Sequence, residues 1–137
     1  TVLDAGAGAS PLPMMLARQG CKVTAIDFDH GGEGGKEKLW GHHPELTLGR
    51  YLATGGNMEK LSYLEVTFDR VVSVGVLEHL KDRGLAISEM RRVLKPGGLL
   101  IVTEDLDIAS LPGAVPPEGA LMYRNTVVAG WVERKDD

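Results

Sequence analysis

The sequence has little cysteine, few aromatic residues and no concentration of positive charge. Its single cysteine, Cys21, permits no internal disulfide, which favours a reducing, cytoplasmic setting. Its 15 lysines and arginines are scattered and are outnumbered by 19 acidic residues, so the net charge is −4. A protein that binds nucleic-acid backbones usually carries a basic stripe. Nucleic acid is therefore not an expected partner.

Long apolar runs are also missing. No stretch approaches the roughly 18 apolar residues of a membrane-spanning helix, and no leader peptide is recognisable, so we expect no membrane segment. The 137 residues predict a single domain, with a core at 1–105 and an irregular extension at 106–137 that holds an additional strand at 126–132. Because the chain lacks an initiator methionine and begins inside a predicted strand, we expect a truncated or minimal domain.

Short apolar runs bounded by turn residues alternate with helical segments. This alternation is typical of an α/β protein with a mainly parallel sheet and helices on both faces, a doubly wound arrangement. The predicted helices cover residues 10–20, a short piece near 36–40, and residues 82–95, after which "KPGG" turns the chain into the last strand. The predicted strands are residues 1–5, 22–27, 50–54, 69–74 and 99–103.

The opening "TVLDAGAGASPLPMM" combines a strand, a glycine turn and a helix start. Glycines let a backbone approach a ligand closely, and the turn directs amide groups toward it. A close strand-to-helix crossover would need the same small residues. What favours a ligand is Asp27, which ends the second strand close to the spacing of about 20 residues at which a carboxylate meets ribose hydroxyls in dinucleotide folds. However, Pro11 stands where the third glycine of the nicotinamide fingerprint belongs.

Four segments occur in a recognisable order: "VLDAGAGAS", "VTAIDFD", "GGNMEKL" followed by "FDRVVSVGVLEHL", and "RVLKPGGLLIVTE". Together they resemble the motifs of the class I S-adenosylmethionine-dependent methyltransferases. Two positions depart from that pattern, since Ser10 replaces a glycine and Asn57 replaces an acid. The resemblance implies a three-layer, Rossmann-like fold with strand order 3-2-1-4-5 and S-adenosylmethionine as the cofactor.

The resemblance assigns the first two strand ends to the methionine and ribose parts of the cofactor. The backbone of Gly6, Ala7 and Gly8 would line the methionine part, with Asp4 near its amino group. Asp27 would hold the ribose hydroxyls.

Other positions are assigned to the adenine and to the transferred methyl group. Phe28 would lie against the adenine face, and Asn57 and Met58 would meet its edge. The Asn57 amide can accept a hydrogen bond from the adenine amino group as an acid does, but without charge. Ser73 and Val74 would border the methyl group.

Methyl transfer needs an aligned acceptor, and it needs a base only when that acceptor carries a proton. His79 is the candidate base, because its side chain can accept a proton at neutral pH near the inferred methyl position. The alternative is a histidine that bonds backbone or the pocket wall. His42 and His43 are adjacent, so their side chains point apart, and no metal site is expected.

We therefore expect an enzyme that methylates a small molecule. Two alternatives stay open: a non-catalytic module that binds S-adenosylmethionine or another nucleotide, and an NAD(P)-binding oxidoreductase, against which Ser10 and Pro11 argue. Residues 99–103 would form an exposed apolar sheet edge. Either residues 126–132 pair with that edge, or a second copy of the chain does and forms a homo-oligomer.

Overall fold

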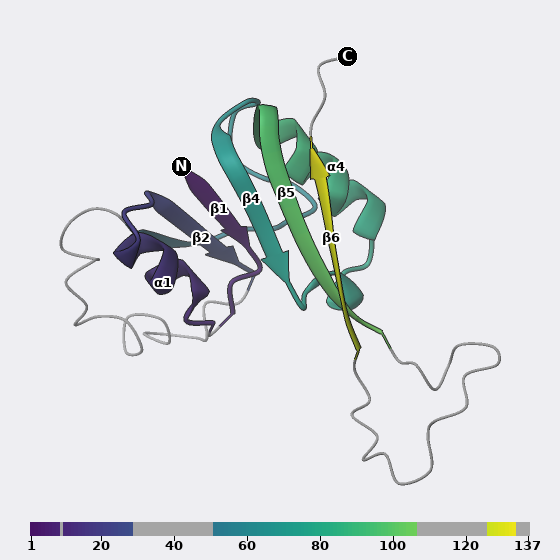
Figure 1. The fold of residues 1–137 in the computed structure, drawn as a ribbon. Helices are drawn as coiled ribbons and strands as arrows, with labels where there is room; N and C mark the ends of the chain where they lie inside the picture. Colours follow the sequence, from purple (N-terminus) through teal and green to yellow (C-terminus); the bar gives the residue numbers. More distant parts are fainter. Residues whose placement is uncertain (9, 29–50, 107–125, 134–137) are drawn as a thin grey trace, which may run out of the picture.

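A computed structural model describes residues 1–8, 10–28, 51–106 and 126–133 (Figure 1). The helix predicted near residues 36–40, together with His42 and His43, lies outside the described residues. Three helical elements are described: α1 (Leu12–Arg18), the 3-10 helix η1 (Leu77–His79) and α4 (Arg83–Val93). The strands are β1 (Val2–Ala5), β2 (Val23–Asp27), β3 (Tyr51–Gly55), β4 (Phe68–Val74), β5 (Leu94–Leu106) and β6 (Thr126–Glu133).

The described strands form one six-stranded sheet in the order β3-β2-β1-β4-β5-β6 (Figure 1). The pairings from β3 through β5 are all parallel, whereas β6 runs antiparallel to β5. The predicted order 3-2-1-4-5 is confirmed. Because the strands are parallel, the carboxyl ends of β1, β2 and β4 meet at one end of the sheet, where open α/β sheets bind their ligands.

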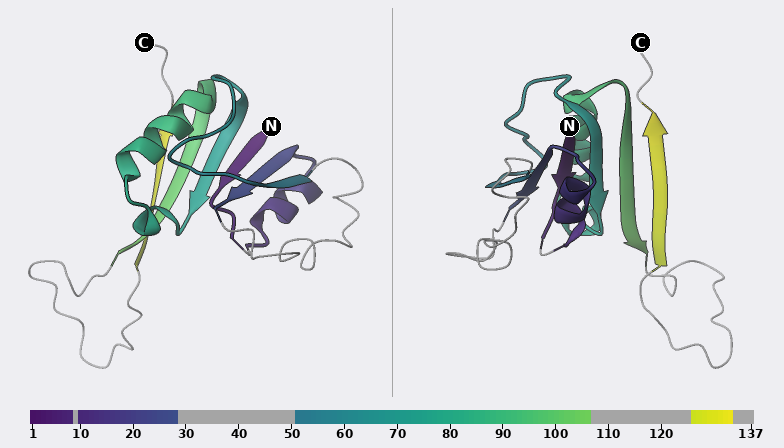
Figure 2. Two further views of the ribbon diagram at one scale, coloured as in Figure 1. Left: turned by 180° about the vertical axis from the view of Figure 1, so that it is seen from behind. Right: turned by 60° about the vertical axis from the view of Figure 1, so that its left-hand side comes forward.

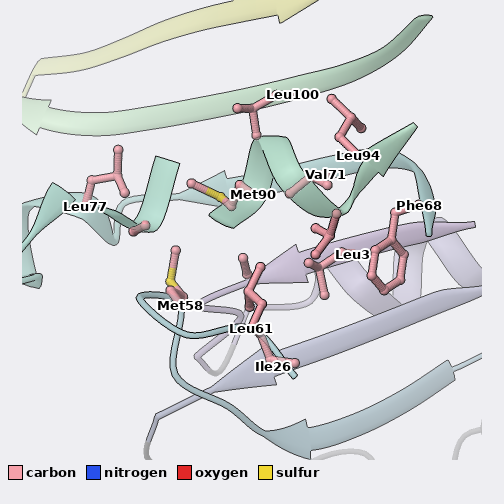
Figure 3. Close-up of a cluster of buried hydrophobic side chains, with 13 residues drawn as sticks. Leu3, Ile26, Met58, Leu61, Phe68, Val71, Leu77, Met90, Leu94 and Leu100 are labelled. Atoms are coloured by element: carbon pink, nitrogen blue, oxygen red, sulfur yellow. The ribbon is translucent and has the colours of Figure 1, made fainter. Parts of the chain in front are cut away.

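Successive strand residues pack on opposite faces of this sheet. Val2 and Val72 belong to a cluster that includes Ala17 of α1. Their neighbours Leu3 and Val71 belong to a second cluster, which includes Met90 of α4 (Figure 3). The alternation is the two-residue period of a strand. The sheet is therefore covered by α1 on one face and by α4 on the other, and Figure 2 shows α4 in front of β5 when the molecule is seen from behind.

Helix α1, Leu12–Arg18, begins two residues after the start of the predicted range 10–20 and ends two residues before its end. The Ser10 hydroxyl accepts a hydrogen bond from the Leu12 amide at 3.2 Å. At the other end Gly20 has a φ of +89°, and the Cys21 amide donates to the Leu16 carbonyl at 3.1 Å. The left-handed glycine lets the chain turn back from the helix directly into β2.

Strand β5 begins five residues before the predicted start at residue 99, because Leu94 pairs with Phe68 as soon as α4 ends. The register then shifts, and the next pair is Arg70 with Leu99. Residues 95–98, the predicted turn, loop out within the strand as a bulge, with Gly97 at a φ of +68°.

Strand β6 pairs with β5 along the sheet edge that was predicted at residues 99–103. Its pairing with β5 runs from Leu99 opposite Glu133 to Leu106 opposite Thr126. The structure thus has the first of the two predicted arrangements, with β6 paired along the β5 edge. None of the helices in the described ranges is both long enough and apolar enough to cross a membrane.

Candidate functional site

A glycine turn follows β1 and is fastened to the end of β2. The amides of Gly6 and Ala7 both donate to the Ile26 carbonyl, each at 2.9 Å. Gly6 has a φ of +82°, and a Cβ added there would lie 2.5 Å from a methyl group of Val76. The turn therefore needs glycine at this position for its backbone angle and for space.

Asp27 is the last residue of β2 and faces this turn. Its Oδ2 accepts a hydrogen bond from the Gly8 amide at 2.6 Å. Asp4, in β1, is 2% exposed. Strand alternation places both carboxylates on the α1 face, since Asp4 is two residues from Val2 and Asp27 two residues from Ala25. Two acids thus flank the glycine turn from adjacent strands.

Ser73 and Val74, which were both assigned to the methyl group, lie on opposite faces of the sheet at the end of β4. Val74 is 46% exposed and lies on the α1 face, two residues beyond Val72. Ser73 points to the α4 face and is fully buried. The chain then turns at Gly75, whose amide donates to the Thr103 carbonyl at 3.0 Å and to its hydroxyl at 3.1 Å. Only Val74 shares a face with Asp27.

The residues assigned to adenine also differ in their surroundings. Phe28 follows Asp27 and is 86% exposed. The Gly56 amide donates to the Asp27 carbonyl at 3.0 Å, which brings Asn57 beside the β2 end. The Asn57 Oδ1 accepts from the Glu59 amide at 2.8 Å in a local turn. Met58 is buried in the core cluster on the α4 face (Figure 3).

His79 lies in η1, which follows the carboxyl end of β4. Its side chain is 76% exposed, and its Nε2 is 3.9 Å from the Glu78 Oε1. The imidazole is therefore at the predicted end of the sheet but is surrounded largely by solvent. Among the residues that the structure describes, no group of three histidine, cysteine or acidic side chains could hold a metal ion.

Three contributors to this site could not be predicted from the sequence. The Ile26 carbonyl anchors the glycine turn, the Val76 side chain fills the space that Gly6 leaves, and Thr103 fixes the turn after β4. A backbone acceptor leaves no signal in residue type. Val76 and Thr103 act through contacts between segments distant in sequence, which a residue pattern does not reveal.

The site suits a cofactor that has a ribose and a positively charged end. Among the described residues, a Cβ added at Gly8 would meet only the Asp27 Oδ2, at 4.0 Å, so this part of the turn leaves room for a ligand. The Asp27 carboxylate can accept hydrogen bonds from ribose hydroxyls, and the buried Asp4 carboxylate suits a nearby cation. The fold is that of a Rossmann-like domain, and the groups at its strand ends are those that a nucleoside-containing cofactor needs. The residues present fit S-adenosylmethionine, which has a ribose, an amino group and a sulfonium.

Comparison with known proteins identifies the family. Residues 3–102 match the family described as the methyltransferase domain, and the chain belongs to this family, whose cofactor is S-adenosylmethionine. The chain is 35% identical over 103 residues to the demethylmenaquinone methyltransferase of Streptomyces avermitilis, covering 75% of this chain and 41% of the relative. It is 30% identical over 134 residues to the thiol S-methyltransferase TMT1B of Rattus norvegicus, covering 96% and 50%.

A solved structure supports the same fold. Phosphoethanolamine N-methyltransferase 2 of Haemonchus contortus, in complex with S-adenosyl-L-methionine, matches with a TM-score of 0.66 at 23% identity, covering 77% of this chain and 24% of that one. The chain spans half or less of the length of these three proteins, as their coverages of 41%, 50% and 24% show.

Proposed function

We propose that the protein transfers a methyl group from S-adenosylmethionine to a small-molecule acceptor, and that this chain supplies the cofactor-binding part. The observation that carries the proposal is the contact between Asp27 and the glycine turn, with 2.6 Å between the Asp27 Oδ2 and the Gly8 nitrogen. Family membership supports methyl transfer and gives no support to the nicotinamide-dependent alternative.

When bound, S-adenosylmethionine supplies a methyl group on a positively charged sulfur that leaves as a neutral thioether. Asp27 would bind the ribose hydroxyls, and the backbone from Gly6 to Gly8 would line the methionine part. The buried Asp4 carboxylate would orient the amino group in the methionine part of the cofactor. These residues hold and orient the reactants, and that is the main task in a displacement of this kind.

The acceptor is proposed to be a small organic molecule. The two curated relatives are named for a demethylated menaquinone and for a thiol, and each of these acceptors loses a proton on methylation. In this chain the exposed side chains at the strand ends include the apolar Phe28 and Val74. Apolar contacts there would suit an acceptor with an apolar body.

His79 is proposed as the base for an acceptor that loses a proton. Its position after β4 supports the proposal, and its exposure leaves the imidazole open to a bound acceptor. Replacing His79 with Gln should then lower kcat and leave the affinity for S-adenosylhomocysteine unchanged, because Gln cannot take up the proton. An unchanged kcat would assign His79 a structural role.

A transfer assay tests the proposed function. The protein is incubated with S-adenosylmethionine labelled in its methyl group and with separate small thiols, phenols and quinols. The expected result is label in one acceptor class and stoichiometric formation of S-adenosylhomocysteine. The alternative is a module that binds the cofactor without catalysis, and it would show tight binding of S-adenosylhomocysteine with no transfer to any acceptor.

A further inference from the structure

Two side chains of helix α4 form hydrogen bonds with the backbone of the segment that connects β3 to β4. The Glu89 Oε2 accepts from the Leu61 amide at 2.9 Å, and the Arg92 Nη2 donates to the Leu61 carbonyl at 3.0 Å. The Arg92 Nη1 also donates to the Tyr63 carbonyl at 2.8 Å. Two side chains of α4 thereby satisfy three backbone groups of a connecting segment, as a neighbouring strand would.

The Glu89 and Arg92 side chains also form hydrogen bonds with each other. The Arg92 Nε lies 2.7 Å from the Glu89 Oε1, and its Nη2 lies 2.8 Å from the Glu89 Oε2. This forked pair holds the pKa of Glu89 below its usual value and raises the pKa of Arg92. The guanidinium geometry is rigid, so the pair is preorganised toward the segment.

The same segment reaches the cofactor end of the sheet. At its start, the Gly56 amide donates to the Asp27 carbonyl at 3.0 Å. Further along, the Glu59 Oε1 accepts from the Asp82 amide, just before α4, at 2.9 Å. Residues 56–63 are therefore fastened to β2, to the start of α4 and to its last turns. Asn57 and Met58 lie between the first two of these attachments.

We infer that Glu89 and Arg92 are positioning residues for the cofactor site. They act through the backbone of Leu61 and Tyr63, and they set where Asn57 and Met58 stand beside the end of β2. The inference rests on the proposed function. Loosening the pair should weaken cofactor binding more than it slows transfer at saturation, since the end of β4 has its own attachment to Thr103.

The experiment measures the affinity of the 137-residue chain for S-adenosylhomocysteine by calorimetry. Arg92→Ala should raise Kd by about tenfold, the effect of losing one or two hydrogen bonds. Arg92→Lys should recover only part of the loss, because one ammonium cannot span both carbonyls. The control is Arg91→Ala, which removes the same charge from an exposed position on the same helix and should leave Kd unchanged.

Hydrogen exchange separates positioning from general stability. In Arg92→Ala, the amides of residues 57–63 should exchange faster while those of the central strands keep their protection. If the variant fails to fold, Glu89→Gln is measured, which keeps an acceptor for the Leu61 amide and should raise Kd by a smaller factor. Unchanged affinity in the folded variants, even with a lower melting temperature, would overturn the inference. A parent chain that fails to bind would instead contradict the proposed function, and with it this inference.

Discussion

At the scale of single residues, the site depends on a backbone conformation that few side chains tolerate. Gly6 and Gly20 both have positive φ, +82° and +89°, but only Gly6 faces another side chain. A Cβ at Gly6 would overlap Val76, whereas one at Gly20 would have nothing within 4 Å. Alanine substitutions at the two glycines therefore distinguish the cost of backbone strain from the cost of steric overlap.

Gly6→Ala should destabilise the fold by about 2–4 kcal/mol, because a clash adds to the cost of the backbone angle. Gly20→Ala should cost only about 1 kcal/mol, from the backbone angle alone. Urea unfolding of both variants checks this difference. Equal losses of unfolding free energy in the two variants would show that Val76 moves aside and that the space at Gly6 is not restrictive.

The Asp69 carboxylate makes the stability of the fold depend on pH. Its Oδ1 lies 2.8 Å from the Lys95 Nζ, and hydrogen bonds from Lys95 and from the Thr1 hydroxyl hold its pKa well below the usual range. Because this pKa is depressed in the folded state, the stabilisation is present above the unfolded pKa of about 4 and is lost as the pH falls through the folded pKa.

Asp69→Asn should therefore lower stability at neutral pH, and its difference from the parent should shrink as the pH falls below about 4. The effect should be small, because both side chains are partly exposed and screened by solvent. Denaturant unfolding at several pH values measures it. In a Lys95→Gln background the Asp69→Asn effect should be smaller, and an equal effect there would remove Lys95 as the main cause.

At the scale of elements, local signals predicted the fold well and long-range contacts were beyond them. A helix was predicted at residues 82–95, and α4 spans Arg83–Val93 with Ala86, Met90 and Val93 buried. Asp27 was placed at the end of β2 by the apolar run before it, and it lies there. By contrast, the burial of Met58 and the hydrogen bonds from Arg92 to the Leu61 and Tyr63 carbonyls depend on segments far apart in sequence.

Strand β5 offers a test at this scale. Its residues 99–103 pair with β4 on one side and with β6 on the other. The amides of residues 99–103 should therefore exchange slowly with solvent in a monomeric sample. Exchange as fast as that of an exposed edge would contradict the pairing with β6 and would restore the β5 edge as a surface for association.

At the scale of the whole molecule, the described sheet gathers its binding features at one end. The glycine turn after β1, the carboxylate ending β2 and the turn after β4 all lie at the carboxyl ends of neighbouring parallel strands. The family relatives extend well beyond the part that this chain matches, since the alignments cover 41% and 50% of their lengths. This chain therefore holds the part of the fold that is proposed to bind the cofactor, and the acceptor is a separate proposal.

The central claim is that this chain binds S-adenosylmethionine with Asp27 on the ribose. The most direct measurement is calorimetric titration of S-adenosylhomocysteine into the parent chain and into Asp27→Asn, which keeps the shape of the side chain and removes its charge. The account predicts one site in the parent and a Kd raised by about tenfold or more in the variant, because a charged acceptor is lost. Equal affinities in the two proteins, with both folded, would contradict it.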